Sequence, residues 1–150
     1  MFFKIISAGT SGIEGYIVEV EADMTKGLPG FSLVGLPNAA VKESKERIKS
    51  AVCNSGFRYP NKKIIVNLSP ADIKKEGSHY DLAIALAILR EVENIAEEKF
   101  EDIAFIGELS LDGKLKPIKA CTALILGLLK NSKIKKVIIP FENFNEASMI

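Results

Sequence analysis

The sequence predicts one domain of the α+β class, residues 1–150, in which a mixed or antiparallel sheet carries three main helices. The first observation is an opening run of strand patterns with no helix between them, at residues 3–7, 16–22 and 31–34. The second is that the long helical patterns come only afterwards, at residues 38–56, 82–89 and 119–130. A regular parallel α/β sheet would instead alternate strand and helix from the start.

Alternation and turn residues define the strands. In residues 16–22, Tyr16, Val18 and Val20 lie on one face of the strand, and Ile17, Glu19 and Glu21 lie on the other. Further strands are predicted at residues 63–68 and 136–140. The dipeptide Asp112-Gly113 lies between two strand patterns, 103–109 and 114–117, and predicts a hairpin there.

The helix at residues 38–56 has clear boundaries. Asn38 is placed to cap its first turn and Gly56 to end it. One helical face gathers the small and apolar residues Val41, Ser44, Ile48, Ala51 and Val52. Lysines and arginine crowd the other faces, with glutamates among them. The favoured interpretation is a solvated surface with paired charges, and contact with a nucleic acid is the alternative.

Composition excludes several classes of protein. A length of 150 residues suits one domain with a true core, and a formal charge of +1 gives no overall field toward nucleic acid or a membrane surface. No apolar run is long enough for a membrane span or a signal peptide, so a cytoplasmic location is expected. Cys53 and Cys121 lack metal-ligand spacing and are interpreted as free thiols, with a disulfide or metal role as the alternative.

Residues 75–81 (KEGSHYD) invite a catalytic interpretation. Ser78, His79 and Asp81 resemble a triad in composition, but side chains within one helical turn diverge, whereas nucleophile and base must meet. Ser78 and Asp81 have the S-x-x-D spacing of a capping box, which predicts that a helix starts here. A metal held by His79 with Glu76 and Asp72 would be weak, because only one histidine is present.

The sequence can also be compared with the requirements of a serine–lysine dyad and of a nucleotide site. A serine–lysine dyad of Ser78 and Lys119 requires a lysine whose pKa is lowered by burial, and Lys119 begins an apolar helix. A nucleotide site requires the motif G-x-x-x-x-G-K-[ST], and the glycine-rich stretches 9–15 and 27–35 lack its lysine and precede strands. Direct ATP binding by this chain is therefore not predicted.

Three motifs together carry a resemblance to a known family. They are GLPN at residues 35–38 with E-S-x-x-R at 43–47, VNLSPAD-x-x-KEGS-x-x-DL at 66–82, and GELSLDG at 107–113. The chain is similar, over nearly its whole length, to the N-terminal domain of magnesium-chelatase-related AAA+ ATPases of the competence-associated ComM (YifB) family. That domain resembles the proteolytic domain of Lon, in the fold class of domain 2 of ribosomal protein S5.

The resemblance to Lon can be followed residue by residue. Lon-type sequences carry K-D-G-P-S-A-G, and without a gap the nucleophilic serine falls on His79 while Ser78 replaces the proline. They also carry G-E-L-T-L-T-G followed by the catalytic lysine, which falls on Thr122, with Lys119 three residues too early. Both catalytic positions are therefore substituted. The resemblance implies that the domain has no catalytic residues, although a shifted Ser78–Lys119 dyad remains an alternative.

For function, the resemblance implies a non-catalytic accessory domain cut from a longer AAA+ ATPase that processes DNA in competence, recombination and branch migration. ATP and Mg²⁺ are expected for that parent protein and no cofactor for this chain. Expected partners are DNA, the parent's own AAA+ domain and neighbouring subunits of a hexameric ring, with no membrane. A purely structural module for ring assembly is the third hypothesis. The candidate DNA-contacting residues are Lys42, Lys45, Lys49, Arg58, Lys62, Lys63, Lys74 and Lys75.

Overall fold

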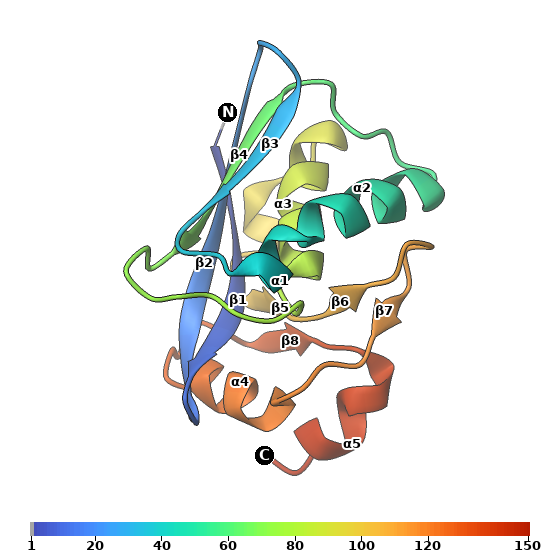
Figure 1. The fold of residues 1–150 in the computed structure, drawn as a ribbon. Helices are drawn as coiled ribbons and strands as arrows, with labels where there is room; N and C mark the ends of the chain where they lie inside the picture. Colours follow the sequence, from blue (N-terminus) through green and yellow to red (C-terminus); the bar gives the residue numbers. More distant parts are fainter. Residues whose placement is uncertain (1) are drawn as a thin grey trace.

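The structure, a computed structural model, describes residues 2–150 and is built on a six-stranded sheet. Figure 1 shows the sheet as a steep twisted layer with helices packed against it. The strand order is β3-β4-β2-β1-β5-β8. The bounds are β1 Phe2–Ser11, β2 Glu14–Thr25, β3 Gly30–Val34, β4 Lys63–Ser69, β5 Ile103–Phe105 and β8 Lys136–Ile138. A separate hairpin pairs β6, Glu108–Leu109, with β7, Leu115–Lys116.

The sheet is mixed, which confirms the predicted fold class. β2 pairs antiparallel with both β1 and β4, so the long opening hairpin forms its centre. β3 runs parallel to β4, and β5 runs parallel to β1 and β8. The alternation predicted for residues 16–22 is also confirmed, because Val18 and Val20 are fully buried and Glu19 and Glu21 are not.

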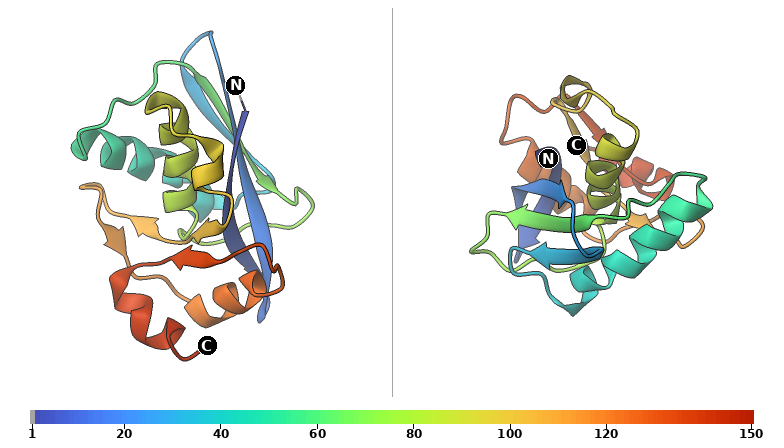
Figure 2. Two further views of the ribbon diagram at one scale, coloured as in Figure 1. Left: turned by 180° about the vertical axis from the view of Figure 1, so that it is seen from behind. Right: turned by 90° about the horizontal axis from the view of Figure 1, so that it is seen from above.

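Helices cover both faces of the central hairpin. Ile5, Val18 and Val20 pack in one apolar cluster with α3, whereas Ile6 and Ile17 pack in a second cluster with α4. Figure 2 shows α3 packed against the sheet and α2 lying beside α3. The helices are α1 Ala39–Lys42, α2 Ser44–Asn54, α3 Asp81–Val92, α4 Cys121–Leu128 and α5 Phe144–Ala147, with 3₁₀ turns η1 Glu97–Lys99 and η2 Phe141–Asn143.

Helix α4 packs directly on the backbone of β2. A Cβ atom at Gly127 would lie 2.4 Å from the carbonyl carbon of Gly15, and one at Gly15 would lie 2.1 Å from the carbonyl oxygen of Ala123. Both positions therefore require glycine, because any side chain would force the helix off the strand. No helix among residues 2–150 is both long and apolar enough to cross a membrane. Cys53 and Cys121 are free thiols, as predicted.

The predicted helix at residues 38–56 is two helices separated at Glu43. The side chain of Asn38 accepts a hydrogen bond from the Val41 amide at 2.9 Å, so its capping role is confirmed. The predicted apolar face is buried, and Gly56 adopts a positive φ of 87° just past the end of α2. The break leaves one turn, α1, ahead of the eleven-residue helix α2.

The predicted strand at residues 103–109 is likewise divided. β5 belongs to the main sheet, whereas β6 pairs with β7 across Asp112 and Gly113, which confirms the hairpin. Between them the amide of Ile106 donates to Ile138 O, and that of Gly107 donates to His79 O. The first bond holds this segment to β8, and the second joins it to the start of α3.

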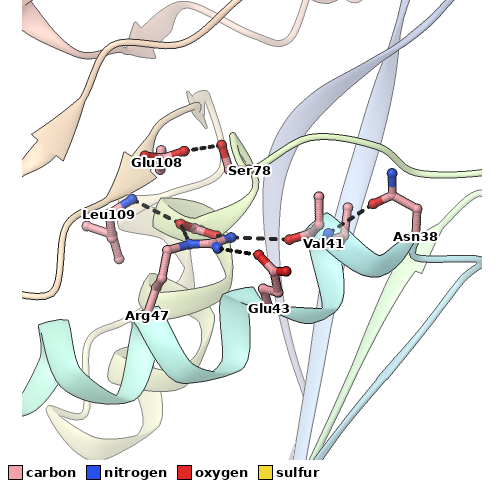
Figure 3. Close-up of polar contacts among 9 residues, drawn as sticks. Asn38, Val41, Glu43, Arg47, Ser78, Glu108 and Leu109 are labelled. Atoms are coloured by element: carbon pink, nitrogen blue, oxygen red, sulfur yellow. Dashed lines mark hydrogen bonds and ion pairs between the residues drawn. The ribbon is translucent and has the colours of Figure 1, made fainter.

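The capping box predicted for α3 is wrong. The helix begins at Asp81 without a side-chain cap, and both residues of the motif have distant partners. Ser78 Oγ donates to the Glu108 carboxylate, while Asp81 accepts two bonds from Arg47, at 2.7 and 3.0 Å, and one from the Leu109 amide at 3.0 Å (Figure 3). Asp81 is fully buried, and burial raises the pKa of its carboxyl from the ordinary value, against the effect of Arg47.

Replacing Asp81 with Asn is expected to lower the free energy of unfolding by about 3 kcal/mol, because Arg47 keeps its charge and loses its buried partner. Chemical denaturation of both proteins at pH 7 measures the change. Glu43→Gln is the matched control: Glu43 lies 3.7 Å from Arg47 with an exposed side chain, so its loss should cost less than about 1 kcal/mol. Equal losses in the two variants would contradict the role given to Asp81.

Candidate functional site

A hollow of about 430 Å³ lies at the start of α3, beside His79, the position to which the resemblance to Lon assigns the nucleophile. We call it the Ser78 hollow. It is bounded by α1 and α2, by the start of α3 and by the segment that follows β7. Its walls are Ala40, Glu43, Arg47, Gly77, Ser78, His79, Glu108, Pro117, Ile118 and Lys119. The arrangement brings Ser78 and Lys119, the two members of the alternative dyad, to one site.

Their environments do not match those of a serine–lysine pair. The Ser78 hydroxyl donates to Glu108 (Figure 3). Among the described residues no hydrogen bond joins it to Lys119. Lys119 is exposed to solvent, so it lacks the burial that this alternative dyad requires. A lysine that acts as a base toward serine must lie within hydrogen-bond reach of it, and Lys119 forms no such bond with Ser78 among the described residues.

His79, the residue predicted to replace the nucleophilic serine, is a core side chain. It is 9% exposed, and its Nε2 lies 3.0 Å from the Ala8 carbonyl oxygen of β1. Because a carbonyl oxygen only accepts, Nε2 carries the proton of a neutral ring. Burial lowers the pKa of His79 to about 4. The side chain therefore anchors the start of α3 to the sheet, and across residues 2–150 it joins no metal-ligand cluster with Glu76, which is exposed beside Lys74.

Thr122, the residue predicted to replace the catalytic lysine, is the second residue of α4. Its side chain is exposed and belongs to the helix that covers the face of the sheet opposite α3. A threonine hydroxyl cannot replace a lysine amine as a base near neutral pH. Neither position of the dyad thus carries the chemistry that the Lon alignment assigns to it.

Lys75 is the buried lysine of the described chain, and its proposed contact with DNA is wrong. The side chain is 0% exposed, and its ammonium donates to the carbonyl oxygens of Gly35, at 2.7 Å, Pro70 and Ile73. Its backbone pairs with the segment ahead of α1 through Leu36 and Asn38. Burial lowers the pKa of Lys75. Pro70 and Ile73 are close to Lys75 in the sequence, whereas Gly35 lies forty residues before it, and the neighbouring Lys74 is exposed.

Three of the other predicted basic residues meet in a second hollow of about 500 Å³. We call it the Tyr59 groove. It lies between α2, the start of β3 and the segment that leads into β4. Its walls are Pro29, Gly30, Phe31, Lys45, Glu46, Lys49, Tyr59, Pro60, Asn61 and Lys62. Arg58 joins Lys62 in an adjoining hollow of about 340 Å³ on the same segment.

Two lysines of the Tyr59 groove, Lys45 and Lys49, have only long contacts, whereas Lys62 is firmly paired. Lys49 Nζ lies 5.7 Å from the centre of the Tyr59 ring, and Lys45 Nζ donates to Phe31 O at 3.3 Å. Lys62 forms an ion pair with Glu91 at 2.8 Å and is partly neutralised. Burial raises the pKa of Tyr59 to about 12, so its phenol stays uncharged near neutral pH.

The remaining predicted basic residues lie outside this groove. Lys42 ends α1, Lys63 begins β4, and Lys74 stands in the loop before α3 with Glu76 3.9 Å away. All three are exposed. The sequence prediction missed the aromatic members of the groove, Phe31 and Tyr59. A signal was present, since Tyr59 is flanked by Arg58 and by Lys62 and Lys63.

Comparison with known proteins identifies the family. The family model described as subunit ChlI of Mg-chelatase matches residues 20–143. The chain belongs to this family. It is 41% identical over 147 residues to an uncharacterized protein of Mycobacterium tuberculosis, covering 98% of this chain and 29% of that protein. It is 40% identical to YifB of Escherichia coli, covering 93% and 27%, and 38% identical to the competence protein ComM of Haemophilus influenzae, covering 97% and 28%.

The family relation confirms the resemblance to ComM and YifB, and a weaker similarity extends to Lon. The Lon protease of Trichlorobacter lovleyi is 26% identical over 140 residues, covering 89% of this chain and 17% of that protein. The assignment to the class of ribosomal protein S5 domain 2 stays a prediction. The chain spans less than a third of the length of its ChlI-family relatives, so the activity of a whole protein is a matter for proposal.

The glycine-rich stretches do not fit a nucleotide. Residues 9–15 form the turn of the β1–β2 hairpin, and residues 27–35 lead into and form β3. A phosphate-binding loop instead runs from a strand into the amino end of a helix, with a lysine on the phosphates. These two glycine-rich stretches therefore do not have the form of a phosphate-binding loop.

The pKa of His79 predicts a specific dependence of stability on pH. The folded value of about 4 lies below the ordinary value of 6.5, so the folded state binds fewer protons between them. The free energy of unfolding therefore falls as pH falls from 6.5 to about 4, by on the order of 3 kcal/mol from this group. Denaturation of wild type and His79→Gln across that range isolates the contribution, because a glutamine amide can still donate to Ala8 O.

Because the sequence contains a single histidine, proton NMR follows its imidazole without assignment. A midpoint near 4 agrees with the buried neutral ring. A midpoint near the ordinary value, with equal pH dependence of stability in wild type and variant, would contradict it.

Proposed function

We propose that this chain is a non-proteolytic accessory domain of a larger, cytoplasmic ChlI-like AAA+ ATPase and that it contacts DNA. The observation that carries the proposal is the contrast between the side chains that line the two hollows. The Ser78 hollow holds a buried neutral histidine and an exposed lysine where a dyad would need a nucleophile and a buried base. The Tyr59 groove gathers three basic side chains of the predicted DNA-contacting set.

Positive charge suitably placed is enough for contact with the phosphate backbone. The groove has three lysines and one glutamate among its walls, and Arg58 adds charge beside it. This local patch forms although the whole chain carries a formal charge of only +1. The parent protein would supply ATP and Mg²⁺ binding and the ring of subunits, while this domain holds the DNA.

Affinity for DNA is expected to fall steeply as salt rises, because phosphate contacts release counterions. Lys45→Gln with Lys49→Gln should weaken binding and reduce the slope of log affinity against log salt by about 0.7–0.9 per lysine. Lys133→Gln with Lys135→Gln removes the same charge ahead of β8, at the opposite edge of the sheet. This control should keep the salt slope of the wild type. Fluorescence anisotropy with labelled DNA measures all three proteins.

Absence of binding at low salt would remove the DNA role and leave ring assembly as the function of the domain. Equal losses in the groove and control variants would show that only net charge matters and would overturn the location of the contact.

One observation favours a second candidate, a serine–lysine peptidase, because Ser78 and Lys119 line the same hollow. For a non-proteolytic domain we expect only background cleavage of casein by the wild type, unchanged in Ser78→Ala and Lys119→Gln. An active Lon protease on the same casein is the positive control. Cleavage above background that either variant abolishes would establish the second candidate in place of a non-catalytic domain.

A further inference from the structure

The Tyr59 groove combines aromatic and basic side chains in a recess of small-molecule size. Phe31 and Tyr59 supply ring surface, while Lys45 and Lys49 come from the neighbouring face of α2. Lys45 and Lys49 are four residues apart, so both project from one side of the helix. The volume of about 500 Å³ lies within the range of pockets that take one small organic group.

The Tyr59 ring offers its face to the groove. The ammonium of Lys49 lies over it at 5.7 Å from the ring centre, so this face meets a flexible and exposed lysine side chain. Exposed contacts of this kind are weak, and the lysine can move to a phosphate when one is present. A flat uncharged group can then take the place over the ring.

A nucleic-acid base beside a phosphate has the chemistry that this recess accepts. Base–aromatic stacking tolerates any sequence, and lysines that flank the ring suit the adjoining backbone. A duplex keeps its bases paired and stacked, so it offers the ring no free base face. Lys62 is paired with Glu91, and Glu46 adds a negative charge to the walls of the groove. Lys45 and Lys49 are therefore its main positive charges.

We propose that the Tyr59 groove binds single-stranded DNA, with one base stacked on Tyr59 and the neighbouring phosphates on Lys45 and Lys49. The inference rests on the proposed DNA contact and specifies its substrate as unpaired strands. The stacked base accounts for affinity that phosphate contacts alone do not provide.

The test compares a labelled deoxythymidine strand of about 15 nucleotides with a duplex of equal length. At low salt, Tyr59→Leu is expected to weaken binding of the single strand about 5- to 150-fold and that of the duplex little. Tyr59→Phe keeps the ring and should keep the affinity. Circular dichroism checks that each variant is folded, because Tyr59 also packs against the core.

A second measurement needs no destabilised variant. The chain has three tyrosines and no tryptophan, and Tyr16 and Tyr80 do not line the groove. Stacking should quench the tyrosine fluorescence of the wild type on addition of the single strand. Tyr59→Phe should bind equally well with that quenching lost.

The outcomes separate this inference from the proposed function. If the single strand and the duplex bind equally, and Tyr59→Leu changes neither, stacking is overturned and the DNA contact remains. If neither binds at low salt, both proposals fail. Weakened single-strand binding in Tyr59→Leu, with quenching that depends on Tyr59, supports the groove as the site.

Discussion

The buried carboxylate of Asp81 is the contact on which the arrangement of this domain depends. It joins α3 to Arg47 of α2 and to the amide of Leu109 in β6. Since Arg47 is two residues from both Lys45 and Lys49, fixing its direction turns those lysines to another side of α2. That side faces Tyr59. A single buried charge pair thereby sets the relation of α2 to the core and presents the groove.

In the loop before α3, two residues of the Lon-like motif hold the backbone in place. Lys75 uses its ammonium to hold three backbone carbonyl groups, and His79 uses its ring to hold β1. Each is buried, and each has a pKa lowered by burial, the condition that active sites also exploit. Here both groups are engaged with the backbone. Their lowered pKa values follow from burial beside the backbone groups that they hold in place.

The sequence predicted most of the fold because its strands and helices have strong local patterns. The alternation of β2, the apolar length of α3 and the Asp112-Gly113 turn each determined an element correctly. The capping box failed because Ser78 and Asp81 found partners about thirty residues away in the chain, which outweigh a local cap. Tertiary structure also buries Lys75 while Lys74 stays exposed, and it brings Tyr59 to Lys49. Neither result follows from spacing along the chain.

We propose that this domain binds its ligand at the Tyr59 groove and not at the Ser78 hollow. Titration of ¹⁵N-labelled protein with a short single-stranded deoxyoligonucleotide tests this most directly, since amide shifts report both hollows in one experiment. We expect shifts concentrated along α2 and residues 58–62, with the amides around Ser78 and Lys119 unmoved. Shifts concentrated at Ser78 and Lys119, or absent from the groove, would contradict the proposal.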